Sequence, residues 1–120
     1  MQAILLRQPG SLDTIELADA PMPHAGPGEL LVRVLAAGVN PADWKVAQRG
    51  MPGWRLPQVL GLDGVGIVEA VADGVQGFRP GNTVWFHQGL TRLGAFAEHI
   101  AVEALPKKLS MDAMFTMHPP

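Results

Sequence analysis

Three glycines crowded into one apolar stretch have the residue type and spacing to bind phosphate. In VLGLDGVGIVEAV, residues 59–71, Gly61, Gly64 and Gly66 fall within six positions, a density typical of loops whose backbone N–H groups hold phosphate oxygens. A dinucleotide-binding loop also needs a strand before its glycines, a helix after them, and a third glycine where the helix meets the strand. Glu69 stands where that third glycine belongs. The glycine spacing therefore does not by itself establish a phosphate site.

The residues that follow these glycines favour a strand over a helix. Ile67, Val68 and Val71 are β-branched, and such side chains are enriched in strands. Asp73-Gly74 ends the segment before a helix could develop, so the helix N-terminus that would bind a pyrophosphate is missing. We therefore predict that the glycines let a strand bend sharply and let another backbone approach it closely.

Metal and thiol chemistry have few candidate ligands in this chain. There is no cysteine, which excludes disulfides, thiol nucleophiles and cysteine-ligated zinc, and which fits a reducing compartment. The four histidines, His24, His87, His99 and His118, show no metal-ligand spacing. His87 and His99 could meet across paired strands, but an ordinary strand histidine is the commoner explanation. We predict no metal site.

A second group of polar residues begins a short predicted helix over residues 40–50. Asn40 suits the N-cap, Pro41 suits the first turn, and Gly50 suits the C-terminal stop. Asp43 falls in the first turn, where a carboxylate complements the helix dipole. The local pattern thus predicts that Asn40 caps the helix and that Asp43 compensates the helix dipole.

The elements that must position these residues are mostly short strands. Pro21, Pro23 and the Gly26-Pro27-Gly28 run make a long irregular connection. The predicted strands cover 3–6, 14–17, 29–39, 65–72, 82–87, 94–102 and 105–107. Many short strands at regular spacing predict a β-barrel or sandwich, and the lack of helix–strand alternation argues against a doubly wound sheet.

Composition narrows the class of protein further. The 120 residues carry a net charge of −2, with 48% hydrophobic and 17% charged residues, as in a single globular domain. The nine Lys and Arg are scattered, so no nucleic-acid partner is expected. The first apolar run meets Arg7 and Pro9 early, too soon for a signal peptide or a membrane span. We expect no membrane partner and a cytoplasmic location.

Three separated segments, in order along the chain, resemble one known domain. PGELLVRVLAAGVNPADWK, LPQVLGLDGVGIVEAVADGVQGFRPGNTV and GAFAEHIAV are similar to the N-terminal GroES-like domain of the medium-chain dehydrogenase/reductase superfamily, above all its zinc-free quinone oxidoreductase, zeta-crystallin-like branch. The resemblance implies a mainly β fold, a partly open barrel with one or two short helices, over residues 1–109. Residues 110–120 resemble the start of a linking helix capped by Ser110 and then diverge, with no Rossmann domain in the chain.

The same resemblance bears on zinc. Zinc-dependent members carry a cysteine after the strand that here ends in Gly38-Val39, and a Gly-His-Glu motif later in the domain. This chain has Asn40 near the first place and Leu62-Asp63 at the second. The four-cysteine structural zinc lobe of those members is absent as well. The resemblance therefore agrees with the ligand count in implying no catalytic zinc.

The resemblance also implies site residues. Asn40 resembles an active-site residue whose amide donates a hydrogen bond to a substrate carbonyl as the oxygen gains charge, and it can cap the helix as well. Asp43 matches a recurrent acid of the same helix and is the second catalytic candidate. Trp44 and Asp63 are implied at the substrate pocket, although Trp44 could equally anchor the helix to the barrel. Trp85, Phe86 and Phe96 are expected in the core or at an interface.

What the chain does then follows as an expectation from the resemblance. It looks like the substrate-side domain of an NADPH-dependent, zinc-free quinone or enal oxidoreductase, whose active site lies against a Rossmann domain that holds NADPH. Without that domain we expect a truncated chain, inactive alone, that binds no cofactor by itself; its cofactor-binding residues are unknown. The alternative is a standalone barrel acting as a non-catalytic binding or oligomerisation module. Apolar surface left uncovered predicts a homo-oligomer.

Overall fold

The computed structural model describes residues 1–10 and 12–104. Its elements, in chain order, are β1 (Gln2–Leu6), the 3-10 turn η1 (Leu12–Thr14), β2 (Ile15–Asp19), β3 (Glu29–Ala37), α1 (Pro41–Arg49), β4 (Gln58–Val59), β5 (Asp63–Val71), β6 (Thr83–His87) and β7 (His99–Glu103). The fold is mainly β, with one α-helix and two open sheets, which confirms the expected partly open GroES-like barrel. The predicted strand over 105–107, the cap at Ser110 and the tail 110–120 lie outside the described residues.

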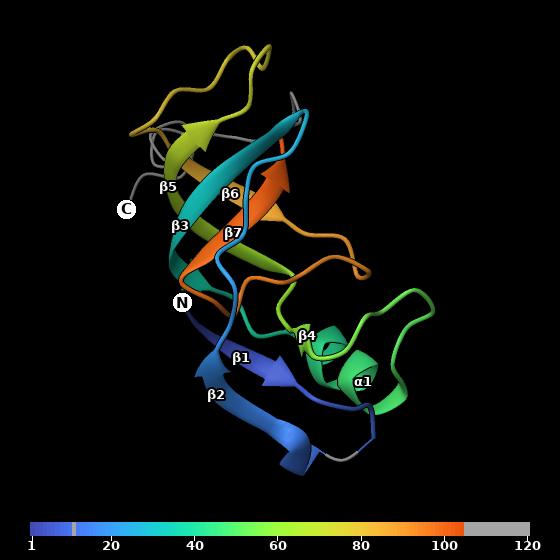
Figure 1. The fold of residues 1–120 in the computed structure, drawn as a ribbon. Coiled ribbons are helices and arrows are strands. Elements are labelled where there is room, and N and C mark those ends of the chain that lie inside the picture. Colours follow the sequence, from blue (N-terminus) through green and yellow to red (C-terminus); the bar gives the residue numbers. More distant parts are fainter. Residues whose placement is uncertain (11, 105–120) are drawn as a thin grey trace.

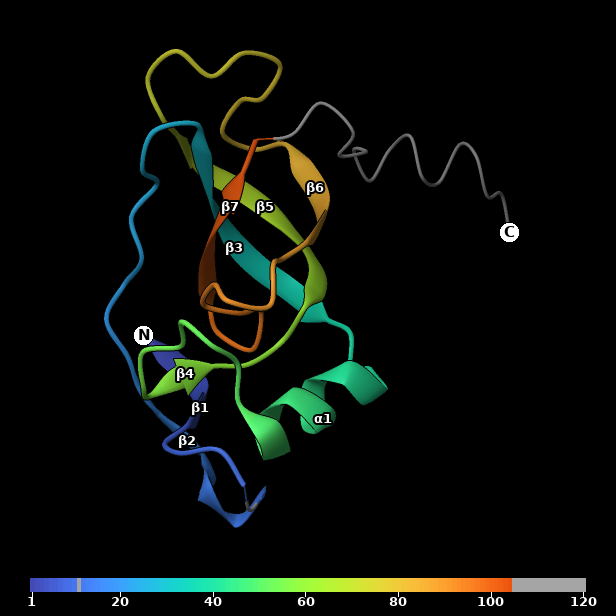
Figure 2. The same ribbon diagram turned by 90° about the vertical axis from the view of Figure 1, so that its right-hand side faces the viewer.

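The strands form two antiparallel sheets. One has the order β2-β1-β4, and the other has the order β6-β5-β3-β7. Figure 1 shows the four-stranded sheet above the three-stranded one, with α1 beside β4. Figure 2 shows that the connection from β2 to β3 runs along the outside of both sheets. Backbone bonds also join the sheets, since the Ile4 amide donates to the Phe96 carbonyl at 2.7 Å.

The main core lies on the inner face of the four-stranded sheet. Alternate residues of its strands point inward, as the period of a strand requires, and the apolar side chains are almost fully buried. They are Leu30 and Val32 of β3, Val68 of β5, Val84 and Phe86 of β6, and Ile100 and Val102 of β7, together with Ala95. Phe86 is therefore a core residue, as expected, whereas Trp85 on the outer face is exposed.

The crowded glycines lie at Gly61, before β5, and at Gly64 and Gly66 inside it, where β3 crosses closely. A Cβ on Gly64 would lie 2.6 Å from the Ala36 carbonyl oxygen, and one on Gly66 would lie 2.6 Å from Cγ1 of Val32. The β3–β5 register shifts between Val34 and Ala36, beside these glycines, as at a β-bulge. The predicted strand and the predicted close backbone approach are both confirmed.

One predicted strand is much shorter in the structure. The strand expected over 94–102 begins only at His99. Before it, the amides of Gly94 and Phe96 donate to the carbonyls of Val59 and Leu60 at 2.9 and 2.8 Å, so the segment bends to meet β4 instead of continuing β7. His87 and His99 do not meet across paired strands, the less favoured of the two readings, because β6 and β7 lie at opposite edges of the sheet. No helix in the described residues is long and apolar enough to cross a membrane.

Candidate functional site

Asn40 lies between the end of β3 and the start of α1, in the extended conformation that suits an N-cap. Its backbone amide donates to Oδ2 of Asp43 at 2.7 Å, and the Asp43 amide donates to the Asn40 carbonyl at 2.9 Å. The Asp43 carboxylate thus holds the first turn of α1 closed, the reciprocal half of a capping box. The N-cap position predicted for Asn40 is confirmed, and Asp43, predicted to compensate the helix dipole, also makes a capping bond.

Asp63 joins the same site from the start of β5. The Asn40 amide Nδ2 donates to Oδ1 of Asp63 at 3.3 Å, and the Gly38 backbone amide donates to the Asp63 carbonyl at 3.0 Å. Any Cβ on Gly38 would overlap Oδ1 of Asp63, so the glycine leaves room for the carboxylate. Asn40, Asp43 and Asp63 therefore form one polar cluster, from two segments more than twenty residues apart in sequence.

Asp43 is the most deeply buried member of this cluster. It is only 4% exposed, and its second oxygen, Oδ1, has no hydrogen-bond partner among the described residues. The carboxylate sits at the N-terminal end of α1, where the helix dipole favours a negative charge. The capping bond uses Oδ2, and Oδ1 remains a buried hydrogen-bond acceptor without a donor among the described residues.

Trp44 is only partly covered by the rest of the domain. The residue is 45% exposed, and the Lys45 ammonium lies 5.7 Å from the ring centroid, within cation–π range. The buried face of the helix is made instead by Val46 and Ala47, and Ala47 packs against Leu6 and Leu60. Trp44 is free to present an apolar face to a ligand beside the polar cluster, a role that stays a prediction.

His87 is a neighbour of this cluster that the sequence analysis did not place there. The β5–β6 register sets His87 directly opposite Asp63, and directly opposed residues carry their side chains on the same face of a sheet. His87 is exposed and has no hydrogen-bond partner within the described part of the chain. Only the strand register could have revealed this position, since 24 residues separate the pair.

The arrangement does not fit a zinc ion or a dinucleotide pyrophosphate. No group of three or more His, Cys, Asp or Glu close enough to hold a metal occurs among residues 1–10 and 12–104, and Leu62 has no ligand atom. The glycine segment runs on as strand β5, so no helix N-terminus follows it to bind phosphate.

What the cluster can do is donate one oriented hydrogen bond. An asparagine amide carries two N–H donors, and Asp63 accepts one of them from Asn40. Because a carboxylate holds that donor, the amide plane is fixed and the second N–H keeps a defined direction. An oxygen that gains negative charge during a reaction is the acceptor that such a fixed donor stabilises best.

Comparisons with known proteins bear on the domain as a whole. The family model of the alcohol dehydrogenase GroES-like domain matches residues 26–107. A trans-enoyl reductase of Aspergillus sclerotiorum is 38% identical over 98% of this chain and 34% of its own length. A zinc-type alcohol dehydrogenase-like protein of Staphylococcus epidermidis is 39% identical over 68% of this chain and 24% of its own length.

A solved structure gives the same result for the fold. The crystal structure of the quinone oxidoreductase from Pseudomonas syringae has a TM-score of 0.82 and 30% sequence identity, covering 92% of this chain and 33% of that one. The chain thus spans between 24% and 34% of the length of these relatives. The likeness is to one domain of a longer protein.

Proposed function

The chain belongs to the alcohol dehydrogenase GroES-like domain family, and from that premise we propose that it is the substrate-side domain of an NADPH-dependent, zinc-free quinone or enal oxidoreductase. Membership in this oxidoreductase family rests on the match over residues 26–107. The finer choice of quinone or enal is supported by similarity to a quinone oxidoreductase and a trans-enoyl reductase. The proposal includes a cytoplasmic location, which suits a chain without cysteine.

The hydrogen bond from Asn40 to Asp63 carries the proposal. A nicotinamide cofactor, bound by another part of the protein, supplies the hydride, and this domain supplies the surface against which the substrate carbonyl lies. Asn40 donates its second N–H to that carbonyl oxygen, which becomes more negative in the transition state. A metal would otherwise supply this polarisation as a Lewis acid. Asp63 acts as a positioning residue, because it contacts Asn40 rather than the substrate.

Two other residues complete the proposed surface. Trp44 supplies an apolar face for a flat quinone ring or an enal chain, which suits its half-exposed side chain. Asp43 keeps α1 and Asn40 in place through the capping bond. Zinc-free chemistry is supported by the donor set at this point of the chain, which offers no thiolate. Among residues 1–10 and 12–104, no three His, Cys, Asp or Glu side chains lie close enough together to hold a metal.

A domain exchange tests the proposal. Residues 1–104 replace the corresponding segment of the Pseudomonas syringae quinone oxidoreductase, and NADPH oxidation is followed with 1,4-benzoquinone and with trans-2-hexenal. We expect turnover of at least one substrate. Asn40→Ala should lower kcat by about 10²–10³-fold, the loss typical when one oxyanion donor is removed. Gln48→Ala is the matched control, since Gln48 lies exposed on the same helix.

Two results would count against this function. One is a folded chimera that binds NADPH and turns over neither substrate. The other is an Asn40→Ala variant that keeps the kcat of the Gln48→Ala control, because the donor would then contribute nothing to the transition state.

A specific observation favours a second candidate function, a standalone barrel that acts as a non-catalytic binding or oligomerisation module. Val39 is 80% exposed beside the cluster, and Trp44 is half exposed. Apolar side chains grouped beside a functional surface are commonly covered by a partner. In the oxidoreductase a cofactor domain covers them, and in the module a second copy of the chain does. Turnover by the domain-exchange chimera separates the two functions.

A further inference from the structure

A cavity of about 660 Å³ lies between the two sheets, away from the polar cluster. The β2–β3 connection, the α1–β4 loop, the loop after β6 and strand β7 all contribute to its walls. Its volume is within the range of small-molecule binding pockets, about 300–1,000 Å³. None of Asn40, Asp43, Trp44 or Asp63 lines it.

The floor of this cavity is apolar. Leu5 of β1, Val59 of β4 and Ile100 of β7 line it and are almost fully buried. Leu56 and Leu93 also line it from two loops, and both are exposed. Apolar side chains at the floor and at the rim suit a ligand with an apolar body.

Two buried glutamines hold one wall of the cavity in place. Gln58 and Gln88 are each 3% exposed. Gln58 Nε2 donates to the Arg92 carbonyl at 2.7 Å, and Gln88 Nε2 donates to the carbonyls of Leu93 and Ala101 at 2.9 and 3.0 Å. These bonds tie the loop after β6 to β4 and β7. Because this wall is already ordered, binding a ligand against it costs less conformational entropy than binding that must first order a loose loop.

Most charged groups that line the cavity are already paired. Arg7 pairs with Glu16, Arg92 pairs with both Glu29 and Glu103, and the Met1 ammonium lies 3.1 Å from Asp19. His99 is held by Glu69 through Nε2 at 2.7 Å. Because each of these positive groups has a negative partner, the pairs together add little net positive charge to the cavity.

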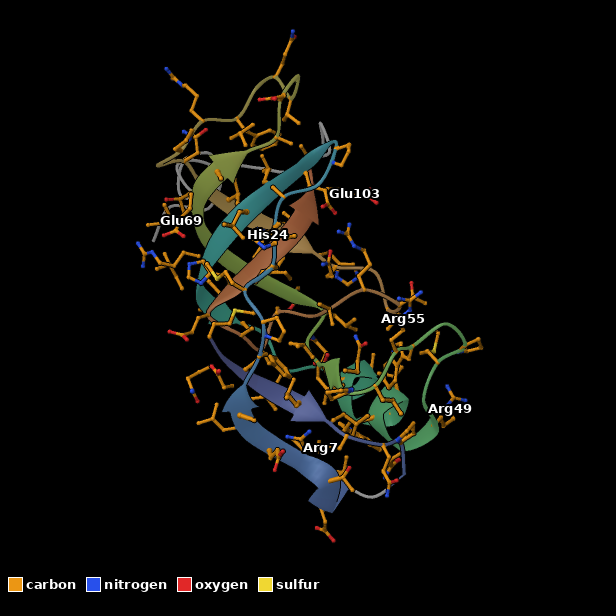
Figure 3. The ribbon with its side chains drawn as sticks, viewed as in Figure 1. Arg7, His24, Arg49, Arg55, Glu69 and Glu103 are labelled. Carbon is orange, nitrogen blue, oxygen red and sulfur yellow. The ribbon has the colours of Figure 1, made fainter. Side chains whose placement is uncertain are left out.

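Arg55 is the exception. Among residues 1–10 and 12–104 it has no ion pair or hydrogen bond, although its side chain lines the cavity from the α1–β4 loop. His24, from the β2–β3 connection, lines the same cavity and also has no partner within that part of the chain. Figure 3 shows Arg7, His24 and Arg55 on three separate segments. Among the described residues, the cavity thus has one guanidinium without an ion-pair partner and one imidazole without a hydrogen-bond partner.

We propose that this cavity binds a small amphipathic carboxylate, a medium-chain fatty acid in size, with its tail over Leu5, Val59 and Ile100 and its carboxylate at Arg55. One unpaired cation matches one negative charge, and the guanidinium fork is the group that holds a carboxylate best. His24 can donate a further hydrogen bond at the mouth. The assignment is independent of the oxidoreductase function, because the two sites share none of the residues named for either.

Calorimetric titration of the full 120-residue chain with octanoate tests the assignment. We expect one site, and a Kd at or below the millimolar range, because the ligand is small. Arg55→Met should weaken octanoate binding about tenfold or more, the loss typical of a hydrogen bond between charged groups. Arg55→Lys keeps the charge and should recover part of that loss. Arg49→Met is the matched control, since Arg49 is an exposed arginine that does not line this cavity.

Octanol separates the tail from the head group. Its binding should be weaker than that of octanoate and the same in Arg55→Met as in the original chain. Leu93→Ser, at an exposed lining position, should weaken both ligands to a similar extent. Both substitutions change exposed side chains, so the fold is expected to survive them.

Three outcomes would overturn the assignment. The first is the absence of any heat of binding at about 10 mM octanoate, because a specific site should bind more tightly than that. The second is equal affinity for octanoate and octanol. The third is a loss of octanoate affinity in Arg49→Met as large as that in Arg55→Met. The last result would place the ligand at the other end of the α1–β4 loop.

Discussion

Adding one methyl group at Gly66 is the sharpest test of how the glycine segment is built. A Cβ at this position would overlap the Arg33 carbonyl of β3 and lie 2.6 Å from Cγ1 of Val32. The Val32 side chain can shift, but the carbonyl belongs to the backbone of a paired strand and cannot retreat without breaking the β3–β5 ladder. Gly66→Ala should therefore destabilise the whole sheet.

The size of the effect follows from three contributions. Forcing an extra carbon into a packed core costs about 1–3 kcal/mol, and loss or distortion of a ladder hydrogen bond adds about 1 kcal/mol. The lower entropy of alanine in the unfolded chain offsets about 0.4–1 kcal/mol. The free energy of unfolding should fall by about 2–3 kcal/mol, a large share of the 5–15 kcal/mol typical of a domain.

Urea unfolding followed by tryptophan fluorescence and circular dichroism measures this change. With m near 1.5 kcal/mol/M, the midpoint should fall by about 1–2 M. Gly89→Ala is the control: a Cβ there would meet only Cγ of Arg92, at 4.0 Å, so its midpoint should stay the same or rise slightly. A Gly66→Ala midpoint within about 0.3 M of the original chain would refute the close-crossing explanation of the glycines.

Three further predictions concern the polar cluster and its surroundings. Asp43→Ala should lower the free energy of unfolding by about 1–2 kcal/mol, because the Asn40 amide loses its acceptor. Asp43→Asn keeps an acceptor oxygen and should lower the free energy of unfolding by less in the same urea experiment. Equal losses in the two variants would argue against the capping bond. Treating the domain-exchange chimera with 1,10-phenanthroline should leave its turnover unchanged, whereas inactivation reversed by zinc would contradict the zinc-free proposal. Sedimentation velocity of the 120-residue chain should show self-association through uncovered apolar side chains such as Val39 and Trp44, and a clean monomer at high concentration would count against it.

The helix and the glycine segment were predictable because their signals are local. Asn40, Pro41 and Gly50 predicted a helix over 40–50, and α1 runs from Pro41 to Arg49, since caps act within one turn. β-branched residues and Asp73-Gly74 predicted a strand after Gly66, and β5 continues to Val71. The place of Asp43 in the first turn followed from its spacing to Asn40, but its capping bond to the Asn40 amide was found only in the structure.

Strand register and loop packing could not be predicted from the sequence, because they depend on contacts between residues far apart in the chain. The sequence analysis allowed His87 to meet His99, but the register places His87 against Asp63 and His99 against Arg33. Register depends on which distant strands bury their apolar faces together, and no residue within a few positions of His87 records that choice. The strand expected over 94–102 was too long for the same reason, since its first residues bond to β4.

The sequence by itself determined the kinds of chemistry open to this protein: no thiolate, no helix after the glycines to bind phosphate, and an asparagine at a helix start. Residue types and short-range spacing decide these points because they concern groups within one or two turns of each other. Only the tertiary structure decided that Asp63 holds the Asn40 amide, and that Arg55 lies beside a cavity with walls from four segments without an ion pair to any other described residue. Those facts depend on contacts between residues far apart in the chain, which packing of the sheets alone brings together.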